Sequence, residues 1–265
     1  CYLMTMFDFY KMQGTGNDFV IINCFDSNQS LSRSQKWGNT TDSKSLARVI
    51  CHRHFGIGGD GLVILHPGAQ ENSVKWEFFN SDGSIAEMCG NAARCVTAFC
   101  YDVLNMSHDN IVIETLAGPV IGTRSTHPQI SMTPVANNKP NQSLQLDGHQ
   151  VSYHFVNTGV PHAVVSFDRF EPNEKTTRLF YQIQNHDNFK PNATNVTGYS
   201  VLSENHILSA SFERGVEDFT MACGTGAVAA AYSYLTSKNI SDGRVRVSVP
   251  GGELYVSVQG QNVFL

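Results

Sequence analysis

Short runs of β-branched and aromatic residues, separated by turn-forming residues, recur along most of this 265-residue chain. Such runs predict β-strands bounded by turns. A hairpin is expected over residues 144–155, with Asp147-Gly148 as a primed turn. The other expected strands are residues 19–25, 62–66, 74–79, 110–115, 130–135, 164–167, 206–212, 244–249 and 254–258.

Four segments carry helical patterns. Residues 42–54, stopped by Gly56, and residues 176–185 predict helices of ordinary kind. Residues 90–104 and 224–238 are rich in alanine and apolar around nearly the whole circumference. A helix that is apolar on all sides is buried, so we expect each of these two to run through the middle of a sheet-wrapped unit.

The two apolar helices reveal an internal duplication. Each follows a strand and a loop of nearly equal length, and Cys89-Gly90 and Cys223-Gly224 stand at the two helix starts, about half the chain apart. The simplest architecture is α+β, with two pseudo-symmetric domains. We expect one domain over residues 1–126, to which residues 259–265 return, and the other over residues 127–258. The polar stretch around Ser125–Pro128 is the expected crossing between them.

Composition narrows the classes of function. Charged residues make up 15% of the chain, below the roughly 25% of a typical domain, and the net charge is −5. No cluster of lysine and arginine offers a binding surface for nucleic acid or an anionic membrane. No apolar run approaches the roughly 20 residues of a membrane-spanning helix, and residues 1–6 lack the features of a secretion signal.

Seven cysteines, an odd number, are scattered through a chain large enough to fold without disulfides. This pattern favours a reducing compartment, and we expect a cytoplasmic protein. We expect no metal, because Cys89 and Cys100 lie ~16 Å apart along one helix at 1.5 Å per residue. The Cys51-His52-Arg53-His54 segment has no partner at metal-ligand spacing.

The placement of Cys89 and Cys223 points to acid–base chemistry. The first N–H groups of a helix lack intrahelical partners and favour negative charge, which lowers the pKa of a cysteine there. Two such cysteines facing a shared cleft suggest a pair in which one thiolate removes a proton and the other thiol delivers one from the opposite side. Backbone N–H groups at Gly90, Asn91, Gly224 and Thr225 would bind the substrate carboxylate and stabilise the carbanionic transition state.

Several motifs have an ordinary structural interpretation. A buried cysteine is usually part of the core, and we assign Cys95 and Cys100 to it, whereas the repeated Cys-Gly favours function. Residues 56–61 match the dinucleotide-binding pattern Gly-x-Gly-x-x-Gly, but a helix precedes them and a strand follows, so we interpret them as a turn. Glu213-Arg214 forms a surface ion pair by default; at a cleft it would recognise an amino group and a carboxylate.

Taken together, the motifs resemble the diaminopimelate epimerase family over nearly the whole chain. The segments that carry the resemblance are Lys11-Met12-Gln13-Gly14-Thr15-Gly16-Asn17-Asp18-Phe19, His54-Phe55-Gly56-Ile57-Gly58-Gly59-Asp60-Gly61, Phe79-Asn80-Ser81-Asp82-Gly83-Ser84, Met88-Cys89-Gly90-Asn91-Ala92-Ala93-Arg94-Cys95, Pro161-His162, Thr194-Asn195-Val196, Glu213-Arg214-Gly215, Ala222-Cys223-Gly224-Thr225-Gly226-Ala227 and Pro250-Gly251-Gly252. Several long motifs in the right order are far more specific than any one of them.

The resemblance implies a cofactor-independent epimerase that interconverts L,L- and meso-diaminopimelate, a step toward lysine and peptidoglycan. It implies that Cys89 and Cys223 are the acid–base thiols and that His162 and Glu213 tune their pKa values. The implied substrate-site residues are Asn17, Asn80, Gly90, Asn91, Asn195, Glu213, Arg214, Gly224 and Thr225. The implied fold has two pseudo-symmetric domains, each a β-barrel-like sheet around a central helix, and the implied assembly is a homodimer.

The chain departs from the family's pattern at three places. Val160 stands where the family commonly has asparagine before Pro-His, Gly61 stands where some members have a substrate-contacting glutamine, and the sequence ends at Leu265, before a terminal segment that helps dimerisation. These departures leave the two-thiol chemistry intact but weaken the expectation of strict preference for diaminopimelate. A racemase of another amino acid and a catalytically silent binding module of the same fold stay open as alternatives.

Overall fold

A computed structural model describes residues 8–25 and 42–265 of the chain, which divides into two compact units, Cys1–Ile130 and Ser131–Leu265. Residues 1–6, where we expected no secretion signal, lie outside the described residues. In the described part of the chain, no helix is both long and apolar enough to cross a membrane.

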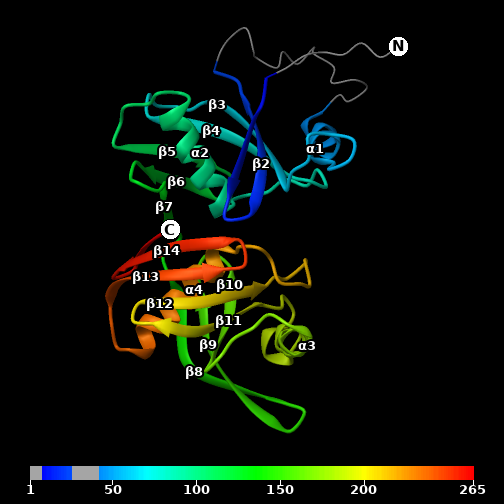
Figure 1. Ribbon diagram of the computed structural model, residues 1–265, viewed down its shortest axis with the longest axis vertical. Helices are drawn as coiled ribbons and strands as arrows, with labels where there is room; N and C mark the ends of the chain where they lie inside the picture. Colours follow the sequence, from blue (N-terminus) through cyan, green and yellow to red (C-terminus); the bar gives the residue numbers. More distant parts are fainter. Residues whose placement is uncertain (1–7, 26–41) are drawn as a thin grey trace. The chain divides into compact units, whose positions relative to one another are not determined.

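The first unit is a sheet whose strands pair in chain order. Its strands are β1 (Tyr10–Gly14), β2 (Asn17–Asn23), β3 (Gly61–Pro67), β4 (Ser73–Asn80), β5 (Asn110–Thr115), β6 (Gly118–Thr123) and the first half of β7 (Gln129–Met132). The β2–β3 and β4–β5 pairs are parallel and the others antiparallel. Parallel neighbours need a crossover, and α1 (Ser43–Cys51) and α2 (Gly90–Asp102) supply the two crossovers (Figure 1).

The second unit repeats this plan. Its strands are β8 (Ala136–Leu146), β9 (His149–Asn157), β10 (Pro161–Phe167), β11 (Asn195–Ser203), β12 (His206–Phe212), β13 (Asp242–Val249), β14 (Gly252–Gln259) and β15 (Asn262–Phe264). The β10–β11 and β12–β13 pairs are parallel. Their crossovers hold α3 (Glu174–Gln184), followed by a 3₁₀ turn at Asp187–Phe189, and α4 (Gly224–Ser237). The alternation of parallel and antiparallel pairs from β9 to β15 therefore matches that from β1 to β7, as the duplicated sequence predicts.

Each unit covers one helix almost completely. Every residue of α4 from Gly226 to Ala231 is buried, and the helix packs against β9 to β14. Helix α2 is buried from Gly90 to Ala93 and over most of the rest of its length. It packs against β1, β2, β5 and β6. Alanine suits these positions because it favours helix and lets the surrounding sheet approach closely. The expected α+β class, with a sheet wrapped around a central helix in each unit, is confirmed.

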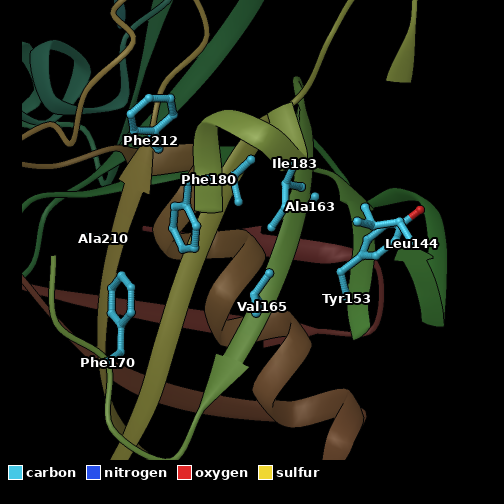
Figure 2. Packing of buried hydrophobic residues seen from close by; sticks show 10 residues of the cluster. Leu144, Tyr153, Ala163, Val165, Phe170, Phe180, Ile183, Ala210 and Phe212 are labelled. Atoms are coloured by element: carbon cyan, nitrogen blue, oxygen red, sulfur yellow. The ribbon is translucent and has the colours of Figure 1, made fainter. Parts of the chain in front are cut away.

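Aromatic rings fill the second unit on the side of the sheet that α3 covers. Phe170 and Phe180 are fully buried and stack with their ring planes 12° apart and their centroids separated by 5.9 Å (Figure 2). Ile183 of α3 belongs to the same cluster. Gly198 of β11 provides the space for this stack, since a Cβ atom there would lie 2.4 Å from the ring of Phe170 and 2.8 Å from that of Phe180.

Most of the expected elements are present. The four expected helices correspond to α1–α4, and the hairpin of β8 and β9 turns at Asp147 and Gly148, both with positive φ as a primed turn requires. Residues 56–60 lie between α1 and β3, which begins at Gly61, and form the expected turn. Strand β11 was not predicted. Its buried positions include Asn195, Thr197 and Ser200, which give it the polar composition of a loop.

The boundary between the units differs from the expected one. We expected it after residue 126, with residues 259–265 returning to the first domain. The structure divides the chain after Ile130. The last strand, β15, pairs with β14 and with Ser131 and Met132 of β7, so its backbone hydrogen bonds place it in the second unit.

The glycine beneath the aromatic stack gives a test of this packing. We expect Gly198→Ala to lower the free energy of unfolding by about 1–3 kcal/mol, because the added methyl group overpacks the ring stack. Gly243→Ala in β13 is the matched control, because its Cβ would meet the flexible end of Leu235 at 3.0 Å and Ile240 at an ordinary contact distance of 3.6 Å. Denaturant unfolding of both variants measures the difference, and equal stabilities would contradict the packing described.

Candidate active site

Cys89 occupies the N-cap position of α2. Its backbone is extended, with φ −144° and ψ 120°, and its side chain makes no capping hydrogen bond to the helix. Its carbonyl accepts the first intrahelical bond, from the N–H of Ala93, at 2.9 Å. The N–H groups of the first turn therefore lie beside a sulfur that does not cap them, as the sequence predicts.

A hydrogen-bonded network fixes the start of α2 against the β1–β2 hairpin. The Asn91 side chain is buried and donates to Oδ1 of Asn17 at 2.7 Å. Asn17 in turn donates to Oδ2 of Asp60 at 3.1 Å. Gly14 allows this approach, because a Cβ atom there would lie 2.8 Å from the carbonyl oxygen of Asn91. The structure thus brings together two of the expected site residues, Asn17 and Asn91.

Arg94, one turn into α2, completes this network. Its guanidinium donates to Oδ1 of Asn91 at 3.0 Å and to Oγ1 of Thr15 at 2.6 Å. Burial lowers the pKa of Arg94, and its charge interacts favourably with the thiolate forms of Cys95 and Cys89. Arg94 belongs to the motif over residues 88–95, but the sequence alone assigns it no role; the signal that identifies it is an arginine in a largely apolar helix.

Asp60 and Asp18 anchor the glycine-rich turn to the hairpin. Asp60 accepts from the backbone N–H of Asp18 as well as from Asn17. Asp18 forms ion pairs with Arg53 at 2.8 Å and Lys11 at 2.7 Å. The hydrogen bond from Arg53 is the main reason that the pKa of Asp18 lies well below its usual range. The pattern Gly-x-Gly-x-x-Gly thus positions Asp60, a residue that we did not predict.

Asn80 and Gly61 lie opposite each other, on β4 and β3. The Asn80 amide donates to Oγ of Ser84 at 2.9 Å and does not join the hydrogen bonds that link Asn17 to Asn91. Gly61 has no room for a side chain, because a Cβ atom would lie 2.7 Å from the ring of Phe78 and 2.9 Å from the carbonyl oxygen of Phe79. The packing of the sheet therefore accounts for glycine at position 61.

Cys223 occupies the same position in the second unit, at the N-cap of α4. Its backbone is extended, with φ −109° and ψ 112°. Its Sγ lies 3.3 Å from Oγ1 of Thr225, and the backbone N–H of Gly226 also hydrogen-bonds to the sulfur. A small hollow adjoins Cys223 and is lined in part by Ser211 and Thr220.

Glu213 and Arg214 follow β12 directly. Glu213 accepts a hydrogen bond from Thr220 at 2.5 Å and interacts with Cys223, and burial raises its pKa. The backbone N–H of Arg214 donates to Oδ1 of Asn195 at 2.8 Å, so three of the expected site residues meet at the ends of β11 and β12.

His162 lies in the interior of the second unit, on β10, and is fully buried. Its Nδ1 lies 2.9 Å from Oγ1 of Thr197 and its Nε2 lies 3.0 Å from Oγ1 of Thr225. Burial lowers the pKa of His162 to about 3, which keeps the ring neutral. It therefore reaches Cys223 through the Thr225 hydroxyl.

One electrostatic expectation is wrong for Cys223. We expected the start of the helix to lower its pKa. Burial instead raises the pKa of Cys223 to about 12, and the negative charge of Glu213 adds to the rise. The hydrogen bonds from Thr225 and Gly226 act in the opposite direction but do not prevail. At neutral pH, Cys223 is therefore a thiol in this structure.

No group of three or more histidine, cysteine or acidic side chains could hold a metal ion within residues 8–25 and 42–265.

Comparison with known proteins points to one family. The family model described as diaminopimelate epimerase matches residues 9–136 and 154–264. The chain is 41% identical over 234 residues to a diaminopimelate epimerase of Aquifex aeolicus, covering 86% of this chain and 81% of the relative. It is 34% identical to a diaminopimelate epimerase of Hydrogenobaculum sp., covering 96% of this chain and 92% of the relative.

Solved structures share the fold at low sequence identity. A phenazine biosynthesis protein of the PhzF family from Bacillus anthracis matches 97% of this chain and 93% of its own, with a TM-score of 0.68 and 14% identity. A probable proline racemase from Agrobacterium radiobacter matches 97% of this chain and 87% of its own, with a TM-score of 0.62 and 15% identity. These two similarities show the fold alone.

The neutral, buried His162 makes folding sensitive to acid. The unfolded chain binds a proton at this histidine near pH 6.5, whereas the folded chain binds it only near pH 3. Between these values the unfolded state holds more protons, so stability rises with pH and is lost as the pH falls. The loss is about 1.4 kcal/mol per pH unit for such a group.

Denaturant unfolding from pH 7 down to pH 4 measures this dependence. We expect His162→Gln, whose amide does not titrate, to show a shallower loss of stability with acid. The matched control is His149→Gln at an exposed position, which should keep the parental slope. Parallel slopes for the parent and His162→Gln would contradict this account of His162.

Proposed function

Because the chain belongs to the diaminopimelate epimerase family, we propose that it interconverts L,L- and meso-diaminopimelate by moving a proton at one α-carbon, without a cofactor. The chain is an isomerase, as its family is. The proposed reaction belongs to lysine and peptidoglycan precursor biosynthesis. The observation that carries the proposal is the repeated placement of a cysteine at the N-cap position of each unit's buried helix.

In the proposed mechanism, the thiolate of one cysteine takes the α-proton and forms an S–H bond as the Cα–H bond breaks. The thiol of the other cysteine gives its proton to the opposite face of the same carbon, so that its S–H bond breaks and a new Cα–H bond forms. The configuration inverts, the composition is unchanged, and the two cysteines exchange their protonation states. The same pair then catalyses the reverse reaction.

The carbanionic transition state requires electrostatic stabilisation. We propose that the backbone N–H groups at Gly90 and Asn91 and at Gly224 and Thr225 bind the substrate carboxylate at the reacting end. Their support is the position of these residues in the first turns of α2 and α4, where N–H groups lack intrahelical partners. Glycine after each cysteine leaves space for a ligand close to the backbone.

The surroundings of the two sulfurs favour different protonation states. Arg94 interacts favourably with a negative charge on Cys89, whereas burial and Glu213 disfavour a negative charge on Cys223. We therefore propose that the free enzyme holds Cys89 as the base and Cys223 as the acid. In this assignment Glu213 and His162 tune the pKa of the Cys223 thiol. Glu213 acts on it directly, and His162 acts through Thr225.

We propose that Asn17, Asn80, Asn195, Glu213 and Arg214 bind the amino and carboxyl groups of the substrate. The support for this group is the convergence of Glu213, Arg214 and Asn195 at the ends of β11 and β12, together with the firm placement of Asn17 by Asp60. An arginine fork matches a carboxylate in geometry and charge.

A second candidate function is racemisation of a different amino acid on the same scaffold. Val160, in the loop before β10, offers an apolar side chain where the resemblance leads us to expect asparagine, so one polar contact to the distal end of diaminopimelate is absent. The site residues around the two cysteines are the same for both candidates, so only the substrate distinguishes them.

The resemblance also supports a homodimer as the assembly. We propose the cytoplasm as the location, because a pair of reactive thiols must stay reduced to exchange protons.

The two-thiol mechanism predicts the behaviour of cysteine variants. We expect Cys89→Ala and Cys223→Ala each to lower the rate of α-proton exchange with L,L-diaminopimelate in D₂O by about 10²–10⁴-fold or more, because each removes one acid–base group. Proton NMR of the α-proton signal measures the exchange. Cys100→Ala, in the core of α2, is the control and should retain exchange. Parental activity in either Cys89→Ala or Cys223→Ala would refute the mechanism.

A panel of substrates decides between the two candidate functions. With the reduced parental protein, we expect loss of the α-proton signal from L,L-diaminopimelate and not from histidine, glutamate or lysine. Exchange with only one of the other amino acids would favour the racemase. An absence of exchange with every substrate, while both thiols are reduced, would leave a binding module of this fold.

A further inference from the structure

A continuous chain of hydrogen bonds runs through the interior of the second unit to Cys223. Oγ of Ser211 lies 2.8 Å from Oγ1 of Thr197, which lies 2.9 Å from Nδ1 of His162. Nε2 of His162 lies 3.0 Å from Oγ1 of Thr225, which lies 3.3 Å from Sγ of Cys223. This series of hydrogen bonds passes from β12 to β11, then to β10 and finally to α4.

The interior end of this chain of hydrogen bonds is buried and closely packed. His162 and Thr197 are fully buried, and Ser211 is 4% exposed. Helix α4 makes room for the two hydroxyls through Gly226, because a Cβ atom there would lie 1.9 Å from Oγ of Ser211 and 3.1 Å from Oγ1 of Thr197. A hydroxyl pair at this place therefore requires a glycine in the first turn of the helix.

The number of protons on each group determines the direction of the hydrogen bonds between Ser211 and Cys223. A neutral imidazole carries one ring proton, so one nitrogen donates and the other accepts. A thiolate at Cys223 only accepts, so Thr225 donates to sulfur, Nε2 of His162 donates to Thr225, and Nδ1 must accept from Thr197. Ser211 then donates to Thr197.

The thiol state allows these bonds to run in the opposite direction. When Cys223 is protonated, its S–H is hydrogen-bonded to Glu213, and Thr225 is free to donate to Nε2 of His162. The ring proton is then on Nδ1 and is donated to Thr197, whose own proton is accepted by Ser211. Each group holds one proton in both arrangements, so at equilibrium the two arrangements differ in composition only by the proton on the sulfur.

We propose that Thr197 and Ser211 are positioning residues that allow His162 to carry its ring proton on either nitrogen. Through His162 they allow the Thr225 hydroxyl to donate to Cys223 when Cys223 is a thiolate and to Nε2 of His162 when Cys223 is a thiol. This inference rests on the proposed function to the extent that Cys223 must act as acid and as base. Hydroxyls suit this role because each both donates and accepts. Glu213 is the ionisable neighbour that acts on Cys223, and His162 is neutral.

Removal of either hydroxyl should favour one arrangement. In Thr197→Val, a proton on Nδ1 would be a buried donor without an acceptor, so the ring proton stays on Nε2 and Thr225 donates to the sulfur. In Ser211→Ala, the proton of Thr197 loses its acceptor in the thiol arrangement, which disfavours that arrangement as well. Both variants therefore favour the thiolate.

The experiment measures the pH dependence of alkylation at Cys223. Reduced protein is treated with iodoacetamide across pH 6–11, and peptide mass spectrometry follows Cys223 and Cys89 separately. In Thr197→Val and Ser211→Ala we expect the Cys223 profile to move to lower pH by about one unit, or about tenfold faster alkylation at a given pH below the midpoint. The Cys89 profile in the same samples is the internal control.

The conservative variant Thr197→Ser keeps a hydroxyl and should restore the parental profile. An unchanged Cys223 profile in both test variants, or a shift to higher pH, would overturn the proposal. If Thr197→Val does not fold, Ser211→Ala decides, because it removes a single small group. Alkylation does not depend on turnover. Shifted profiles without substrate exchange would therefore contradict the proposed function alone, and exchange with unshifted profiles would contradict this inference alone.

Discussion

The burial of α2 and α4 on nearly every side is the constraint on which the other features depend. A helix that is apolar on all sides is stable in water only if other residues cover its whole circumference. A single sheet can cover it in this way only by wrapping around it. Cys89 and Cys223 stand at the starts of these helices, so the packing that stabilises each unit also places a sulfur beside the first N–H groups of its helix.

Burial also decides the chemistry of the second unit. A helix N-terminus stabilises a negative charge by about 0.3–1 kcal/mol. Burial raises the pKa of Cys223 from 9.0 to about 12, and each pH unit corresponds to about 1.4 kcal/mol. The cost of removing water from the thiolate therefore exceeds the stabilisation that the helix N-terminus gives it. The same effect holds His162 neutral, and a neutral imidazole between two hydroxyls needs no counter-ion inside the sheet.

Sequence reasoning succeeded where a local pattern carries the information. The helix starts at Cys89 and Cys223, the duplication and the turn at Asp147-Gly148 all follow from neighbouring residues, and the structure has each of them. It failed where partners are distant along the chain. Thr197 looks like a loop residue until β10 and β12 lie on either side of it.

Asp60, Arg94 and the sulfur of Cys223 show the same limit. The importance of Asp60 depends on Asn17, and that of Arg94 on Thr15, and neither pair is near in sequence. The pKa of Cys223 could not be predicted from its place at a helix start, because the surrounding sheet determines how much water reaches the sulfur.

Strand β7 has a consequence for the order in which the chain can fold during synthesis. Its first residues pair with β6, which precedes them closely, whereas Ser131 and Met132 pair with Val263 and Phe264 at the other end of the chain. A ribosome therefore completes every partner of the first sheet long before it makes the strand that closes the second. Until that strand emerges, the backbone groups of Ser131 and Met132 form an open sheet edge, the kind of surface that invites pairing with another chain.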